Sequence, residues 1–291
     1  MIPGPDIETA NSHCFAVVRG HYENFPVASW LLPAPLRAPV AAIYAFARRA
    51  DDHADEGDLD PAERLRLLDL EGRALDGDST ALPNDLVHLA LADSIARFQL
   101  PVQLLHDLLT AFRMDVTKHR YADHDELLHY CRHSANPVGR LLLHLFGQAT
   151  PVNLEHSDAI CTALQLINLW QDLDQDIVER DRLYLPHADW TAAGITEAQL
   201  LARDDSLALQ GVIANQLDRA EQSMNQGMPL GGNLPGRLGL EIRLTVEGGL
   251  AVLRACRTRE NSFARPRLPR LVWPGLLWRA LLPTRRWRKM A

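Results

Sequence analysis

Three polar residues spaced four positions apart, Asn168, Asp172 and Asp176, lie near the middle of the chain in the segment NLWQDLDQD. At about 100° per residue, side chains with this spacing share one face of a helix. Asp51 and Asp55 form a second such pair far upstream. Two acidic faces that met in a core would repel each other unless cations lay between them. Mg²⁺ suits such carboxylates because it keeps positions for water and phosphate oxygens, so we expect a diphosphate held by metal between two helices.

The second acidic cluster is the more specific of the two. Asp172, Asp174 and Asp176 interrupt a largely apolar run, and proteins avoid burying carboxylates unless a partner is supplied. The first cluster follows Arg48 by one turn, and an arginine there is a natural further contact for a diphosphate. A charge run of this kind also fits a solvated helix end. Both interpretations of the first cluster stay open on the sequence alone.

Other site types are weakly supported. His129 and His133 are four positions apart, but the H-E-x-x-H pattern of a zinc site is missing and Cys131 points elsewhere on the helix. Structural or surface histidines are therefore the favoured interpretation. The sequence holds no G-x-G-x-x-G and no Gly-rich loop followed by Lys-Ser/Thr, so we expect no nucleotide cofactor.

The elements that must position these residues are all helical. Alternating β-branched runs are nearly absent, and apolar residues recur at three- and four-residue spacing. We expect a single helical domain over residues 1–265 and a basic tail over 266–291, with no internal repeat. The expected helices are Val40–Glu56, Pro61–Leu75, Leu86–Phe98, Val102–Met114, His124–Gly147 with an interruption at Pro137, Ser157–Arg180 with Ser157 as N-cap, Ile195–Met224 as one or two helices, and Leu238–Phe263.

Composition indicates a globular protein of the cytoplasm. Apolar residues make up 47% and charged residues 23% of the chain, and four scattered cysteines read as reduced core residues. We find no secretory signal pattern at the N-terminus and no apolar run long enough to span a membrane. The net charge of −7 is divided unevenly, because the chain from Arg254 onward carries eleven basic residues and one acid. The acidic body argues against nucleic acid as a partner.

The tail admits two interpretations. Its tryptophans and leucines lie among arginines, a pattern typical of a segment that docks on a membrane surface without crossing it. The alternative is a terminal helix packed on the body, followed by a disordered basic end. The apolar residues concerned are Trp273, Leu276, Leu277, Trp278, Leu281 and Leu282.

Several motifs in chain order resemble the squalene/phytoene synthase family of prenyl-condensing enzymes over nearly the whole length. His21 to Phe25 precede Leu31-Leu32-Pro33, and Ile43-Tyr44-x-x-x-Arg48-x-x-Asp51-Asp52-x-x-Asp55 follows. Gln165-x-x-Asn168-x-x-x-Asp172-x-x-x-Asp176 and Arg182-Leu183-Tyr184-Leu185-Pro186 come at the family's distance. Together these motifs are highly specific.

The resemblance implies an all-α isoprenoid synthase-type fold, a helical bundle around a central apolar cavity with the two acidic motifs facing each other. It implies a prenyl diphosphate substrate and Mg²⁺ as cofactor. Tyr130 matches a tyrosine that assists proton transfer or stabilises a cation. The implied metal ligands are Asp51, Asp55, Asn168, Asp172 and Asp176, and the positions implied to hold substrate are His21, Asn24, Tyr44, Arg48, Gln165 and Asn168.

Departures from the common family pattern bear on the product. The segment after Tyr130 reads Ala135-Asn136-Pro137-Val138-Gly139-Arg140 where relatives commonly have Ala-Gly-x-Val-Gly. With His21 to Val27, it resembles the bacterial hydroxysqualene synthase branch of hopanoid biosynthesis, which takes presqualene diphosphate from a sister enzyme. The resemblance implies hydroxysqualene as the product, formed without a reductant. Asn136 is a candidate for holding the attacking water. The alternative role for Asn136 is capping or kinking the helix before Pro137. Head-to-head condensation of two prenyl diphosphates and a non-catalytic assembly role are the other functions to weigh.

Overall fold

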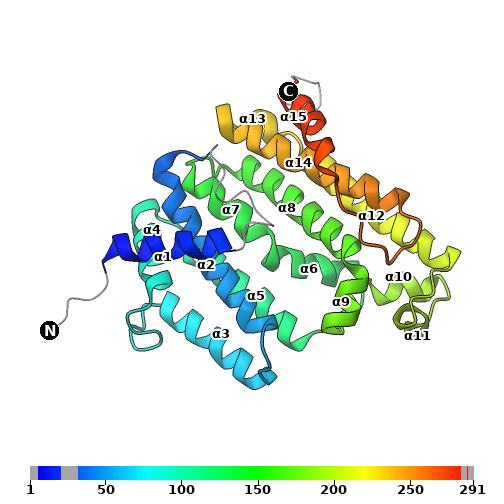
Figure 1. Cartoon of the computed structure of the whole chain (residues 1–291), viewed down its shortest axis with the longest axis horizontal. Helices are drawn as coiled ribbons and strands as arrows, with labels where there is room; N and C mark the ends of the chain where they lie inside the picture. Colours follow the sequence, from blue (N-terminus) through cyan, green and yellow to red (C-terminus); the bar gives the residue numbers. More distant parts are fainter. Residues whose placement is uncertain (1–5, 21–31, 283–286, 288–291) are drawn as a thin grey trace. The chain divides into compact units, whose positions relative to one another are not determined.

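The computed structural model describes residues 6–20, 32–282 and 287, and its regular elements are helices (Figure 1). Within these residues the β contacts amount to one isolated bridge between Arg120 and Leu183. The predicted all-α class is confirmed. The helices are α1 Ile7–Gly20, α2 Ala34–Asp55, α3 Pro61–Leu75, α4 Leu86–Phe98, α5 Val102–Thr117, α6 His124–Ser134, α7 Asn136–Leu145, α8 Pro151–Gln171, α9 Leu173–Arg180, α10 His187–Ala192, α11 Glu197–Leu201, α12 Leu207–Gly227, α13 Leu230–Asn233, α14 Gly236–Thr258, the 3₁₀ turn η2 Arg270–Val272 and α15 Trp273–Leu281.

The chain groups into two compact units. Unit 1 comprises residues 1–117 and 137–149, and unit 2 comprises residues 118–136 and 150–291. The acidic pair Asp51 and Asp55 belongs to unit 1, whereas Asp172 and Asp176 belong to unit 2. The expected organisation as one domain with a tail from residue 266, and the expected meeting of the two acidic motifs, stay predictions.

Unit 1 is built around α2, which packs against α1, α3, α4 and α5. The buried side of α2 is rich in alanine and includes the fully buried Phe46, so neighbouring helices approach it closely. α2 begins at Ala34 rather than near Pro39 as expected, and Pro39 lies inside it. Pro39 is the sixth residue of α2, so α2 forms without the hydrogen bond that an amide there would donate to the Pro35 carbonyl.

Unit 2 is built on the contact of α8 with α12, and α14 packs on both. Glycines allow this approach, because a Cβ on Gly227 would lie 2.6 Å from the His156 carbonyl oxygen. A Cβ on Gly249 would similarly lie 2.7 Å from Cδ2 of Leu164. Close packing of this kind fixes α8, the helix that carries Gln165 and Asn168.

The helical segment that carries the second motif ends at Arg180 as expected, but it differs from the expectation at its start and in its middle. Its N-cap is Thr150, whose hydroxyl accepts from the Asn153 amide at 3.2 Å, so the predicted N-cap at Ser157 is wrong. Ser157 lies inside α8 and is buried. The regular helix also stops at Gln171 and resumes at Leu173. Asp172 sits at the break with φ −101° and ψ 14°.

Candidate functional site

The first acidic motif lies at the C-terminal end of α2, where Arg48 contacts the neighbouring carboxylates. Its Nη2 atom is 2.6 Å from Oδ1 of Asp52, and its Nη1 atom is 3.3 Å from Oδ2 of Asp51. Asp55, one turn after Asp51, is half-buried. Tyr44, one turn before Arg48, is also half-buried, and desolvation raises the pKa of its hydroxyl. α2 therefore brings Tyr44, Arg48, Asp51 and Asp55 together within three turns.

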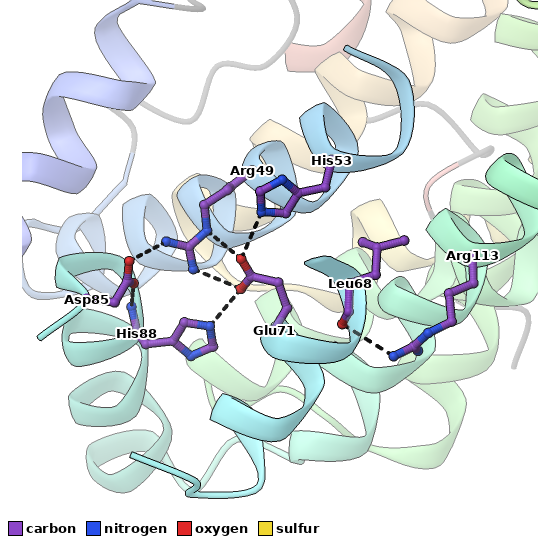
Figure 2. A network of polar contacts seen from close by, with 7 residues as sticks. All are labelled: Arg49, His53, Leu68, Glu71, Asp85, His88 and Arg113. Carbon is purple, nitrogen blue, oxygen red and sulfur yellow. Dashed lines mark hydrogen bonds and ion pairs between the residues drawn. The ribbon is translucent and has the colours of Figure 1, made fainter. Parts of the chain in front are cut away.

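A buried ion network holds another side of α2 (Figure 2). The Arg49 guanidinium contacts both carboxylate oxygens of Glu71, at 2.7 and 2.8 Å, and Oδ2 of Asp85 at 2.7 Å. His53 and His88 also face Glu71, with Nε2 atoms 3.3 and 2.7 Å from its oxygens. Glu71 is 1% exposed. Helices α2, α3 and α4 are thus joined through one carboxylate.

This network fixes the orientation of the α2 segment that carries the motif. Despite the cost of burial, hydrogen bonds from His53 and His88 and the charge of Arg49 hold the pKa of Glu71 far below its usual range. Asp85 also caps α4, since its carboxylate accepts from the His88 amide at 2.8 Å. Arg49 points into the unit and Arg48 to the carboxylates, so adjacent arginines serve separate contacts.

In the second motif, arginines from three parts of unit 2 contact the aspartates. Nη2 of Arg265 lies 3.1 Å from Oδ2 of Asp172, and its Nε also contacts that carboxylate. Arg203 pairs with Asp174, while Nη1 of Arg180 is 3.4 Å from Oδ1 of Asp176. Asp172 and Asp174 therefore do not need a metal to be tolerated, because arginine already compensates them.

Arg265 is a site residue that the sequence pattern did not single out. The segment around it crosses the end of α8, where Nη1 of Arg259 donates to the Trp170 carbonyl at 2.8 Å. A second hydrogen bond links the same two segments, since Nε2 of Gln171 donates to the Pro266 carbonyl at 2.7 Å. Arg265 lies 93 residues from Asp172 and has no periodic relation to it, so only its general place in the basic C-terminal region was visible.

Asp176 is the most buried carboxylate of this motif, at 8% exposure. Desolvation raises the pKa of its carboxyl to about 7. The negative charge of Asp172 also raises this pKa, whereas the charges of Arg180 and Arg182 lower it. Asn168 is exposed and Gln165 is half-buried on the preceding turns of α8. Backbone hydrogen bonds of 2.9 Å from Asp172 to Asn168 and from Asp176 to Asp172 keep the helical path across the break.

Tyr130 belongs to a cluster of three tyrosines in unit 2. It is 5% exposed, and its ring centroid lies 5.7 Å from that of Tyr121 and 5.4 Å from that of Tyr184. Tyr121 and Tyr184 stack at 5.3 Å. The cluster joins α6 to the segment Arg182 to Pro186 that follows α9. Aromatic faces such as these attract cations.

Asn136, the first residue of α7, is buried at 6% exposure. Its side-chain carbonyl accepts a hydrogen bond of 3.0 Å from the Thr162 hydroxyl on α8. Thr162 lies one turn before Gln165. The two remaining expected substrate residues, His21 and Asn24, lie outside the described residues.

The donor chemistry of both motifs fits a hard divalent cation, because carboxylate and amide oxygens are the ligands that Mg²⁺ takes. In the part of the chain that the structure describes, no group of three or more His, Cys, Asp or Glu side chains is assembled to hold a metal. Mg²⁺ is commonly held by one or two carboxylates, water and substrate phosphates, so an all-protein cage is not required.

Comparison with known proteins identifies the family. A model of the squalene/phytoene synthase family matches residues 18–276. The chain belongs to the squalene/phytoene synthase family. Hydroxysqualene synthase from Rhodopseudomonas palustris is 40% identical over 247 residues, which cover 84% of this chain and 83% of that protein. Phytoene synthase from Mycobacterium tuberculosis is 33% identical over 204 residues, or 70% of this chain and 65% of that protein.

Solved structures of this family share the fold. Squalene synthase HpnC from Alicyclobacillus acidocaldarius superposes with a TM-score of 0.80 at 36% identity, covering 86% of this chain and 94% of that one. A dehydrosqualene synthase solved with a ligand also gives a TM-score of 0.80, at 23% identity, covering 94% and 96% of the two chains. The predicted isoprenoid synthase-type fold and family are confirmed.

The buried network of α2 gives a stability prediction. Glu71→Gln is expected to lower the free energy of unfolding by about 3 to 5 kcal/mol at pH 7, because it leaves buried charges uncompensated. The folded pKa of Glu71 lies below its unfolded value, so its contribution is present above about pH 4.5 and disappears on acidification. The difference between wild type and variant, measured by urea unfolding, should therefore shrink below that pH.

Asp69→Asn is the matched control for this experiment. Asp69 lies on the same helix, and its carboxylate accepts from Nη2 of Arg113 at 2.9 Å while being 66% exposed (Figure 2 shows Arg113 also donating to the Leu68 carbonyl). An exposed pair of this kind contributes at most about 1 kcal/mol. Equal losses in the two variants would contradict a special role for Glu71.

For Asp176 we predict the opposite effect on stability: removing the carboxylate should raise the free energy of unfolding. Its folded pKa of about 7 lies above the usual aspartate value of 3.8, so the free-energy penalty on the folded state increases as the pH rises between these values. Asp176→Asn removes this penalty. In buffer with EDTA, the stability of the variant relative to wild type should rise by up to about 3 kcal/mol between pH 5 and pH 8. A pH-independent difference between the two proteins would show that the carboxyl titrates normally.

Proposed function

We propose that this protein converts presqualene diphosphate and water to hydroxysqualene and diphosphate, in a Mg²⁺-dependent step of squalene and hopanoid biosynthesis. The observation that carries the proposal is the 40% identity to a hydroxysqualene synthase across 84% of the chain, with both acidic motifs intact. A second hydroxysqualene synthase, from Zymomonas mobilis, is 36% identical over 253 residues. Phytoene synthases match at lower identity.

The residues of the chain have defined tasks in this reaction. Arg48 and Tyr44, together with Gln165, His21 and Asn24, hold the substrate diphosphate. Asp51, Asp55, Asn168, Asp172 and Asp176 would hold Mg²⁺, which when bound neutralises the leaving group. The bond between the cyclopropylcarbinyl carbon and the diphosphate oxygen breaks, and the diphosphate leaves with the electron pair. After rearrangement, a water oxygen bonds to the carbon cation, and its proton passes to the released diphosphate. No electron donor is needed.

The tyrosine cluster supports the cationic part of this mechanism. Tyr130, Tyr121 and Tyr184 present aromatic rings and little water-accessible surface. Aromatic faces stabilise a carbocation without offering a strong nucleophile that would trap it early. Tyr130 is accordingly the residue we assign to cation stabilisation or proton transfer.

The proposal places the enzyme in the cytoplasm, at the cytoplasmic face of a membrane. Substrate and product are both oily, so transfer from the sister enzyme that makes presqualene diphosphate is shorter at a membrane than through water.

Two other functions use the same fold. One is head-to-head condensation of prenyl diphosphates, either farnesyl diphosphate to presqualene diphosphate or squalene, or geranylgeranyl diphosphate to phytoene. The similarity to phytoene synthases supports this alternative. The other is an assembly protein without catalysis, which would not need both acidic motifs.

Purified protein should consume presqualene diphosphate in the presence of Mg²⁺ and release hydroxysqualene with or without NADPH, as measured by mass spectrometry. EDTA should abolish this turnover. Use of farnesyl or geranylgeranyl diphosphate in place of presqualene diphosphate would assign the condensing activity instead. Absence of turnover with all three substrates would favour the assembly role.

In the same assay, Asp51→Asn and Asp172→Asn should each lower kcat/KM by on the order of 10² to 10³, the cost of losing a group that stabilises the developing charge. Asp174→Asn is the matched control, because Asp174 lies between the proposed ligands and pairs with Arg203 on the exposed side. It should retain nearly full activity.

Asn136 is expected to control the attacking water. Asn136→Ala should shift the product from the alcohol towards hydrocarbons that form by proton loss. Without the Asn136 amide, water is no longer held near the cation, so loss of a proton competes with addition of water. Thr162→Val removes the hydrogen bond to Asn136 and leaves its amide in place. If both variants changed the product equally, or if Asn136→Ala left product and rate unchanged, the role of Asn136 would be structural.

A further inference from the structure

The last helix of unit 2, α15, packs on α14 (Figure 1). Leu276 and Ala280, one turn apart, are 2% and 0% exposed. Arg243 on α14 donates through Nε to the Ala280 carbonyl at 2.7 Å and through Nη1 to the Gly231 carbonyl at 2.7 Å. These contacts determine which side of α15 faces outward.

A second anchor follows α15 in the sequence. Trp287 is 5% exposed and packs on α13, where a Cβ on Gly231 would lie 2.9 Å from Cε3 of the Trp287 ring. A Cβ on Gly232 would lie 1.6 Å from the Trp287 carbonyl oxygen, so no side chain fits there. α15 is therefore held by packing before its end and by Trp287 beyond it.

The outward side of this anchored segment is apolar. Of twelve large hydrophobic side chains that are exposed in the described residues, six belong to residues 271–282. We call these six the tail patch. They are Leu271 (91% exposed), Trp273, Leu277, Trp278 (66%), Leu281 and Leu282.

The positions of these residues on the helix show that the patch is continuous. At about 100° per residue, Trp273, Leu277, Leu281 and Trp278 fall within an arc of about 140°. The buried pair Leu276 and Ala280 lies just outside this arc. Scattered single hydrophobic residues are normal on a surface, but a contiguous group with two tryptophans marks an interaction site.

Charge identifies the partner. Residues 266–291 carry seven arginines or lysines and no acid, in a chain whose net charge is −7. The described Arg267 and Arg279 are exposed, and Nη1 of Arg279 also lies 3.9 Å from Oε2 of the buried Glu247 on α14. A second copy of this chain would bring two basic segments together, which is unfavourable. Tryptophan and leucine bordered by arginine suit the boundary between headgroups and acyl chains of an anionic bilayer.

Crossing the bilayer is not required for this contact. Among the helices that the structure describes, none combines the length and the hydrophobicity of a membrane span. α15 has nine residues, about 14 Å, which suits a helix lying in the plane of the interface.

We propose that the tail patch docks on an anionic lipid surface, with Trp273 and Trp278 inserted at the headgroup level and Arg267 and Arg279 contacting lipid phosphates. The inference does not depend on the proposed reaction, because lipid binding is measured without turnover. A failure of docking and a failure of the proposed activity are therefore separate results.

The test is co-sedimentation of the full chain with sucrose-loaded vesicles of phosphatidylcholine alone or mixed with phosphatidylglycerol. We expect partitioning to the mixed vesicles to exceed that to phosphatidylcholine at low salt and to fall as salt is added. The double substitution Trp273→Ser and Trp278→Ser should lower partitioning at least about tenfold. Leu207→Ser, at a leucine that is 84% exposed at the start of α12, is the matched control and should not change it.

The charge contribution is tested by Arg267→Gln with Arg279→Gln, which should lower binding to the mixed vesicles by about fivefold per arginine. Arg66→Gln on α3 of unit 1 is its control, with an exposed arginine of similar accessibility. Equal partitioning of wild type and the tryptophan variant would overturn the proposal. So would a concentration-dependent dimer in sedimentation velocity that the tryptophan substitutions dissociate, because the patch would then be covered by a second copy.

Discussion

Compensation of carboxylates on packed helices is the constraint on which this structure depends. A carboxylate removed from water must gain a cation or hydrogen bonds, since its desolvation alone exceeds the contribution of most contacts. In unit 1, Arg49 and two histidines compensate Glu71. In unit 2, Arg265 compensates Asp172. The same requirement thus joins α2 to α3 and α4, and the segment after α14 to the end of α8.

This arrangement has a consequence for the proposed chemistry. An arginine that released its carboxylate on binding of the proposed Mg²⁺ would become available for the diphosphate oxygens. The charge in each motif would then stay balanced, with the carboxylates facing the metal and the arginine facing phosphate. Arg48 beside Asp51 and Arg265 beside Asp172 occupy equivalent positions in this exchange. Arg49 does not, because its partner Glu71 is buried and tied to two further groups.

Local pattern was sufficient for much of the fold. The bounds of α3 and α4 match the expected helices, because proline at the start of α3 and Asp85 before α4 are strong local signals. The spacing of the acidic residues also identified both motifs. Glu71 was not recognised, since on a helix rich in charge pairs it resembles a solvated residue until α2 and α4 enclose it. Contacts between residues far apart in sequence decide burial, and sequence periodicity does not report them.

In the proposed reaction, the choice of product would depend on a different part of unit 2 from the second acidic motif. Ionisation would require that the leaving diphosphate be neutralised, the task that the proposal assigns to the two acidic motifs and Arg48. The fate of the cation depends on when water reaches it, and therefore on the walls around it. Tyr130 and Asn136 lie on either side of the break at Ala135, and Thr162 ties Asn136 to α8, one turn before Gln165. The hydrogen bond from Thr162 to Asn136 thus connects the segment that differs from the common family pattern to the helix that would position the diphosphate. In the proposed reaction, a change at Asn136 would alter water access without removing any proposed metal ligand.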